Sequence, residues 1–97
     1  MLFLHKIIGK MFPNVTIKEV KLKFGSLVKL LRKKQNLTQE ELGNKLNLSR
    51  ITIQNLESGK NATMDTMFIV MQYFEILNSF YGQIETEITN SSYGSLY

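Results

Sequence analysis

The sequence predicts a small all-α domain of four to five helices. Apolar residues recur at i, i+3, i+4 and i+7 from Phe24 to Leu31, which is the period of an amphipathic helix. Helix-initiation signals follow at Thr38 with Glu41 and at Ser49, and they divide the next residues into short helices. A chain of 97 residues is long enough for one modest core but not for a second domain.

The composition is that of an ordinary globular protein, with 43% hydrophobic and 21% charged residues. The absence of cysteine excludes disulfides and thiolate metal sites. The longest uninterrupted apolar run, residues 67–71, is far shorter than the ~20 residues of a membrane-spanning helix. His5, Lys6 and Lys10 interrupt the apolar opening "MLFLHKIIGKMF", and no signal-peptide cleavage pattern follows. We therefore expect a soluble, cytoplasmic protein with no membrane partner.

Charge is distributed unevenly along the chain. Residues 1–60 contain all twelve lysines and arginines and four acids, a balance of +8. Residues 61–97 contain four acids and neither lysine nor arginine, a balance of −4. This polarity predicts that the first part meets a polyanion while the second part faces elsewhere. A solvated lysine-rich surface would give the same bias.

The first helix contains the apolar stripe of residues 24–31 and is expected to end near residue 35. Its beginning has two interpretations. Thr16 and Glu19 have the spacing of a capping box, in which each side chain bonds the other residue's amide. The alternation of apolar residues and lysines over residues 20–24 would also suit a short strand.

The second and third helices have clear start and stop signals. Thr38 and Glu41 form a capping box, and Ser49 is a favourable N-cap for the next helix. Asn47 tolerates the left-handed conformation that a tight turn needs, and Gly59 ends the third helix. Two helices of about eight and nine residues, joined by a three-residue turn, are the helix-turn-helix pattern.

The third helix has one side for a core and one side for a ligand. At 100° per residue, Ile53 and Leu56 fall together on the side that can face a core. The other side carries Arg50, Ile51, Gln54, Asn55 and Ser58. Arginine fits guanine, asparagine and glutamine fit adenine, and a small hydrocarbon can contact the thymine methyl. A phosphate contact for the arginine, and a subunit contact or stray aliphatic for the isoleucine, are the alternatives.

Three stretches carry a family resemblance: "FGSLVKLLRKKQNLTQEEL", "LSRITIQNLESGK" and "NATMDTMFIVMQYFEIL". Through them, residues of about 24–77 resemble the Cro/C1 (XRE-type) family, which implies a lambda-repressor-like helix-turn-helix domain. Gly43 and Asn47 stand where alanine and glycine are usual in the family. A glycine at position 43 still lets two helices approach, but it weakens a helix by roughly 1 kcal/mol relative to alanine.

The resemblance implies roles at the matching positions, with double-stranded DNA as the partner. Expected base contacts come from Ser49, Arg50, Ile51, Gln54 and Asn55. Expected phosphate contacts come from Thr38, Gln39, Lys45, Ser58 and Lys60. For Lys45, a solvated side chain is the alternative. Arg32 and Glu57 match a pair that commonly forms a salt bridge between the first and third helices, which makes this glutamate structural.

A fourth helix is expected from the cap Thr63 onward, apolar almost all round and therefore buried on most faces. Helical spacing continues to Ile88 and predicts a fifth helix, although "IETEIT" alternates like a strand. The polar tail "TNSSYGSLY" is expected to be mobile. A dimer or partner interface is expected at Phe68, Ile69, Tyr73, Phe80, Tyr81 and Ile84. A methionine-rich site for a partner is the alternative.

Three parts are expected along the chain: a flexible N-terminal extension (1–15), a helix-turn-helix DNA-binding domain (16–77), and a C-terminal helix and tail for dimer or partner contact (78–97). The expected function is a transcription repressor that binds a palindromic operator as a homodimer, with residues 49–58 in the major groove. The alternative is an antitoxin that neutralises a partner toxin and autoregulates its operon. An enzyme is not expected, because His5 is the only histidine and no acid–base pair accompanies it. Neither a cofactor nor a metal is expected.

Overall fold

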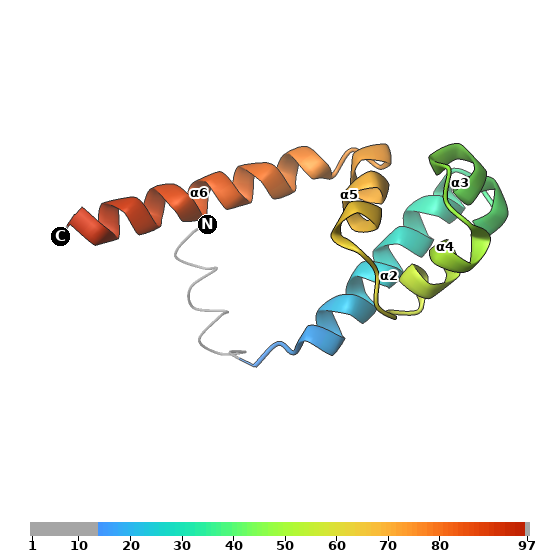
Figure 1. The fold of residues 1–97 in the computed structure, drawn as a ribbon, viewed down its shortest axis with the longest axis horizontal. Helices are drawn as coiled ribbons and strands as arrows, with labels where there is room; N and C mark the ends of the chain where they lie inside the picture. Colours follow the sequence, from blue (N-terminus) through green and yellow to red (C-terminus); the bar gives the residue numbers. More distant parts are fainter. Residues whose placement is uncertain (1–13, 97) are drawn as a thin grey trace.

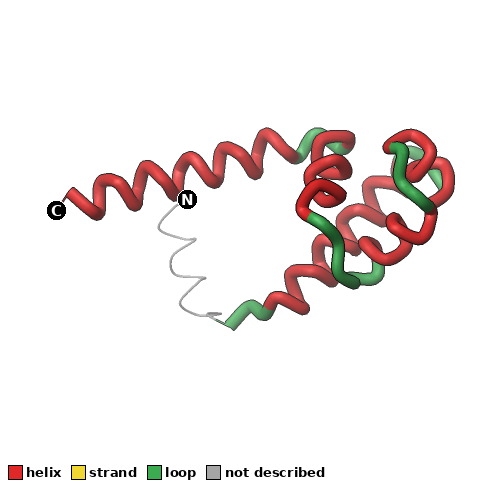
Figure 2. Tube along the Cα trace, in the orientation of Figure 1, coloured by secondary structure: helices red, strands yellow, loops and turns green. Residues whose placement is uncertain are grey.

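The computed structural model describes the backbone of residues 14–96 and the side chains of residues 14–92. The described helices are α2 (Ile17–Lys34), α3 (Gln39–Leu46), α4 (Arg50–Glu57), α5 (Met64–Tyr73) and α6 (Leu77–Leu96). Residues 14–96 contain no strand, so the predicted all-α class is confirmed (Figure 2). Almost all of the expected extension, residues 1–15, lies outside the described residues. No helix within the described range has the length and apolarity needed to cross a membrane.

A capping box begins α2, and this excludes the strand alternative for residues 20–24. The Glu19 amide donates to Thr16 Oγ1 at 3.1 Å, and the Thr16 amide donates to Glu19 Oε2 at 3.1 Å. Two amides that the helix leaves without backbone partners are thereby satisfied. The helix ends at its cap Gln35, beside Asn36 with a left-handed φ of 58°.

The turn between α3 and α4 has the predicted chemistry. The Glu41 amide donates to Thr38 Oγ1 at 3.0 Å, which completes the capping box with the return bond of 2.9 Å. Asn47 takes the left-handed conformation with φ 57°, and Ser49 caps α4. Gly59, with φ 75°, follows the end of α4. Local hydrogen bonds therefore set both helix ends that define the helix-turn-helix unit.

The core is small and lies between α2, α3, α4 and α5. One residue from each of these helices is fully buried: Val28, Leu42, Ile53 and Val70. Leu56 and Met71 are nearly as buried. The first apolar stripe is only partly covered, since Leu27 stays 38% exposed. The core thus holds α4 by one side and leaves its other side uncovered.

Two glycines allow close backbone contacts with α4. A Cβ on Gly25 of α2 would lie 2.5 Å from the Glu57 carbonyl oxygen and 2.6 Å from that of Leu56. A Cβ on Gly43 of α3 would lie 2.5 Å from the Leu48 carbonyl oxygen. Glycine at position 43 weakens the helix, but it also leaves room for the Leu48 carbonyl. Alanine at this position would displace the turn before α4.

The fourth predicted helix, α5, is buried on one side only within a single chain. Val70 and Met71 face the core, but Met64 is 68% exposed and Ile69 is 37% exposed. No described helix covers these two residues, and burial of Ile69 against another subunit stays a prediction. The apolar character of α5 therefore exceeds what one chain buries.

A single long helix, α6, includes both the expected fifth helix and most of the polar tail. It continues to Leu96, so the strand alternative for residues 78–89 was wrong, and the mobility expected of the tail stays a prediction. Residues 89–96 contain no proline and one glycine, Gly94, and so allow backbone hydrogen bonding to continue. Figure 1 shows α6 projecting away from the other helices, with α3 and α4 at the opposite end of the molecule.

We expect Gly25→Ala to lower the free energy of unfolding by about 1–3 kcal/mol, because the new methyl would meet fixed backbone carbonyls. Gly82→Ala in α6 is the matched control, since nothing lies within 4 Å of its Cβ position. The control should be neutral or more stable by up to about 1 kcal/mol. Urea denaturation followed by circular dichroism measures both, and unchanged stability of Gly25→Ala would contradict the close crossing of α2 and α4.

Candidate nucleic-acid interface

The outer side of α4 is the candidate interface. Ile53 and Leu56 anchor the inner side, with exposed fractions of 0% and 4%. Arg50 and Gln54 are exposed on the outer side, and Ile51 is 60% exposed between them. Asn55 is partly buried on the same side, and Ser49 is exposed at the N-terminus of the helix. The structure thus brings the five predicted base-contacting residues to one helix at the end of the molecule opposite the C-terminus (Figure 1).

Three predicted contact residues also bond to the backbone near their own helix ends. Ser49 Oγ accepts from the Thr52 amide at 3.0 Å. Ser58 Oγ donates to the Gln54 carbonyl at 2.8 Å, and Thr38 Oγ1 is the acceptor in its capping box. A hydroxyl offers one donor and two acceptor positions, so these bonds do not exhaust its capacity. Fixing the helix ends and contacting a ligand are therefore compatible for these side chains.

A buried ion pair holds α4 against α2. Arg32 Nε donates to Glu57 Oε2 at 2.6 Å, and Arg32 Nη2 donates to Glu57 Oε1 at 2.9 Å. The two side chains are only 8% and 3% exposed. The third arm of the guanidinium, Nη1, donates to the Leu37 carbonyl at 2.7 Å. This is the pair that the family resemblance implied, and Arg32 also fixes the loop before α3.

Gln39 joins the same cluster. Its Nε2 donates to Glu57 Oε1 at 3.1 Å, so one carboxylate accepts bonds from α2 and α3 at once. The side chain of Gln39, which we expected to contact phosphate, is thus engaged inside the domain. The backbone amides in the first turn of α3 lie at the positive end of the helix dipole, where an anion is favoured.

The ionisation of the pair follows from its contacts. Burial raises the pKa of Glu57, but the hydrogen bonds from Arg32 and Gln39 and the charge of Arg32 outweigh it, so this pKa lies below its ordinary value. The hydrogen bond to Glu57 raises the pKa of Arg32. The carboxylate is therefore ionised at neutral pH, as expected for a structural residue.

Exposed cations surround α4. Lys45 lies in the last turn of α3, Arg50 begins α4, and Lys60 follows its end. Within the described residues, none of the three forms an ion pair with an acid. Lys45 interacts with Glu41 one turn away through charge alone, and all three cations add to the attraction of a polyanion. The same part of the chain contains no cluster of three or more histidine, cysteine or acidic residues that could hold a metal ion.

The residues expected at a dimer or partner interface divide into two groups. Phe68 and Tyr73 are partly buried: the Phe68 ring lies 5.8 Å from that of Phe80, and the Tyr73 hydroxyl donates to Gln35 Oε1 at 2.8 Å. Ile69, Phe80, Tyr81 and Ile84 are between 37% and 64% exposed. The open part of this surface is therefore mainly on α6.

Sequence interpretation missed the part that Gly25 plays in placing α4. A signal was present, since an isolated glycine within a helical pattern often marks close backbone approach. The bond between Gln39 and Glu57 had no comparable signal, because the two residues are 18 positions apart.

The helix-turn-helix family model matches residues 28–76, half of the chain. The chain therefore belongs to this Cro/C1-type (XRE) family of DNA-binding regulators. The match extends from the second half of α2 to the turn after α5, and it includes α3 and α4 entirely. A comparison with curated proteins gives no match.

Removal of the Arg32 side chain should strongly destabilise the domain. Arg32→Ala leaves the Glu57 carboxylate buried without its cation, which typically costs about 3–5 kcal/mol. Lys33→Ala, at the exposed neighbouring position, is the control and should change the stability by less than about 0.5 kcal/mol. Urea unfolding of both variants measures the difference. Equal stabilities would show that the ion pair does not hold α4.

The depressed pKa of Glu57 predicts an acid-sensitive fold. Its stabilising contribution is complete above the unfolded-state pKa of about 4.3 and is lost as the pH falls through the lower folded-state value. The melting temperature of the wild type should therefore fall with pH below about pH 4.5. Glu57→Gln should melt lower at neutral pH and depend less steeply on pH. Parallel melting profiles between pH 3 and 6 would contradict this assignment.

Proposed function

We propose that this member of the helix-turn-helix family of DNA-binding transcription regulators is a sequence-specific repressor. It binds a palindromic operator as a homodimer, with α4 in the major groove. The supporting observation is that α4 is packed through Ile53 and Leu56 and presents a polar outer side. A helix held in this way can enter a groove without exposing the core. Binding to double-stranded DNA also implies a cytoplasmic or nucleoid location.

The proposed base contacts come from the outer side of α4. Arg50 offers parallel donors that suit guanine O6 and N7, and the carboxamides of Gln54 and Asn55 suit adenine. Ile51, an exposed aliphatic residue on a polar surface, suits the methyl group of thymine. Ser49 stands at the N-terminal end of α4, which is the end that contacts base edges in such motifs.

The proposed phosphate contacts lie on both sides of α4. They come from the side chains of Thr38, Lys45, Ser58 and Lys60 and from the backbone amide of Gln39, whose side chain bonds to Glu57. The lysines supply charge, and the start of α3 supplies amides near the positive end of a helix dipole. We assign DNA binding to the domain of residues 16–77, and we assign dimer or partner contact to the C-terminal helix and tail of residues 78–97.

A homodimer would contact a longer DNA site than a single copy can. One α4 helix contacts only a few base pairs, whereas a two-fold dimer contacts two half-sites ~34 Å apart. The two acids of α6 agree with this arrangement, because α6 projects from the end of the molecule remote from α4 (Figure 1). Glu85 and Glu87 would then stay clear of the phosphates.

An antitoxin is the second candidate. The observation that favours it is the exposed apolar surface of α6, which could receive an unrelated chain as readily as a second copy. A toxin gene beside the coding sequence, and co-purification of its product with this protein, would support that function.

The DNA-binding proposal separates two kinds of residue. Arg50→Ala or Asn55→Ala should weaken binding to the preferred operator by about 1–3 kcal/mol and relax the preference at one base pair. Lys60→Ala should weaken binding to all sequences alike and lower the salt slope by about one unit. Fluorescence anisotropy with operator and scrambled duplexes over a range of salt concentrations measures both effects. Identical profiles for Arg50→Ala and Lys60→Ala would refute this division of roles.

A further inference from the structure

An apolar stripe on α6 has no cover in the described part of the chain. Phe80, Tyr81, Ile84 and Ile88 are 41%, 64%, 43% and 60% exposed. Their spacing places them along one side of the helix. Phe80 packs on Phe68 of α5, and beyond this contact α6 runs away from the other described helices (Figure 1). A stripe of this kind on a regulator of this size indicates a docking surface.

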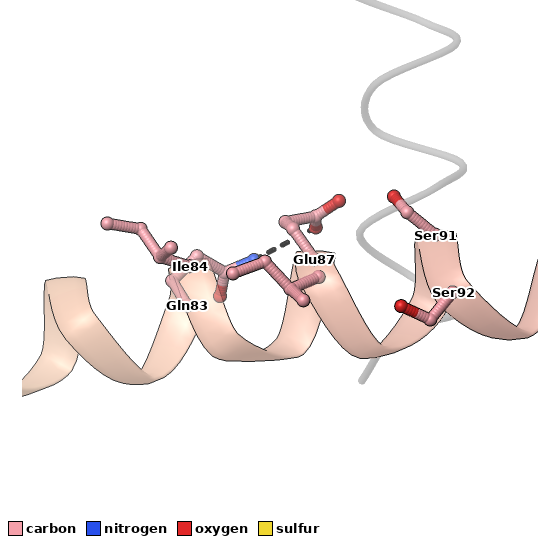
Figure 3. A pocket seen from close by; sticks show the side chains of 6 residues that line it. Gln83, Ile84, Glu87, Ser91 and Ser92 are labelled. Carbon is pink, nitrogen blue, oxygen red and sulfur yellow. Dashed lines mark hydrogen bonds between the residues drawn. The ribbon is translucent and has the colours of Figure 1, made fainter.

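Acidic residues border the stripe on both sides. At 3.6 residues per turn, Glu85 and Glu87 lie roughly 80° to either side of its centre. Ile84 and Glu87 lie along a shallow hollow on α6, where Gln83 Nε2 donates to Glu87 Oε1 at 3.2 Å (Figure 3). Lysine and arginine are absent from the whole sequence after residue 60. The apolar stripe of α6 is therefore bordered by acidic residues and has no lysine or arginine beside it.

The first half of α2 has the complementary pattern. Val20 and Phe24 line an apolar groove of about 220 Å³ with Met67 and Met71 of α5. Val20 is 55% exposed, and Ile17 extends the apolar surface with 77% exposure. The groove also reaches Phe80, where the α6 stripe begins.

Lysines border the α2 groove as glutamates border the α6 stripe. Lys21 and Lys23 lie roughly 80° to either side of the line through Val20 and Phe24. Lys21 lines the groove directly and also donates to Asn61 Oδ1. In paired helices, opposite charges on the two helices beside the apolar contact determine which helices pair.

We propose that α6 of a second copy docks on α2 beside this groove, and that the exchange is reciprocal. Ile84 and Ile88 of one copy then pack near Val20 of the other, with glutamates beside lysines. This inference rests on the proposed homodimer and specifies its surfaces. Pairing of α6 with α6 would instead bring four glutamates together along one seam without any base, which like-charge repulsion opposes.

Charge reversal in two variants of the full chain tests this arrangement. One variant carries Glu85→Lys and Glu87→Lys, and the other carries Lys21→Glu and Lys23→Glu. Each variant alone should dimerise at least roughly tenfold more weakly than the wild type, because like charges meet at both reciprocal contacts. An equimolar mixture should form heterodimers, since each contact then joins opposite charges. Sedimentation equilibrium measures the association, and circular dichroism checks that the variants are folded.

The alternatives give different results. Wild-type dimerisation by the Lys21→Glu, Lys23→Glu variant would exclude α2 as the docking surface while leaving the proposed homodimer intact. A monomeric wild type would overturn the inference, whereas operator binding by that monomer would still support DNA recognition. The single variants Glu87→Lys and Lys23→Glu provide the same contrast if a double variant does not fold.

Discussion

The ion pair between Arg32 and Glu57 fixes the position of α4, and the candidate function depends on that position. Its carboxylate accepts bonds from α2 and from Gln39 of α3, so the three helices meet at one buried charge. Gly25 permits this meeting because its missing side chain lets α2 approach the last carbonyls of α4. Hydrophobic packing at Ile53 sets which side of α4 is inside. Together these contacts leave the polar side of α4 facing outward.

Features that depend on neighbouring residues could be predicted from the sequence, and features that depend on distant residues largely could not. The capping box at Thr38 forms within one helical turn, and helical periodicity separates Ile53 from Ile51. The crossing at Gly25 depends on how two separate helices pack. The full length of α6 was missed because a polar composition was taken as a sign of mobility, although little in residues 89–96 prevents a helix.

The molecule separates two kinds of surface. Around α4, exposed cations and hydrogen-bonding groups suit a polar, anionic ligand, while α6 offers apolar residues between acids. In the proposed complex with DNA, the same sequence polarity would attract the phosphates to the α4 end and repel them from the α6 end. In the proposed dimer, the exposed apolar stripe of α6 in one copy packs on α2 of the other copy. The glutamates beside the stripe then lie near the lysines of α2. Neither surface is explained by the stability of a single chain.

Selection of binding sites from a random duplex library by the purified wild-type protein tests the central claim most directly. The claim is that the outer side of α4 discriminates between base pairs. The account predicts enrichment of one short motif, repeated as an inverted pair with half-site centres one helical turn, or a multiple of it, apart. Weak and equal retention of every duplex after repeated rounds would contradict it, because electrostatic attraction alone carries no preference for sequence.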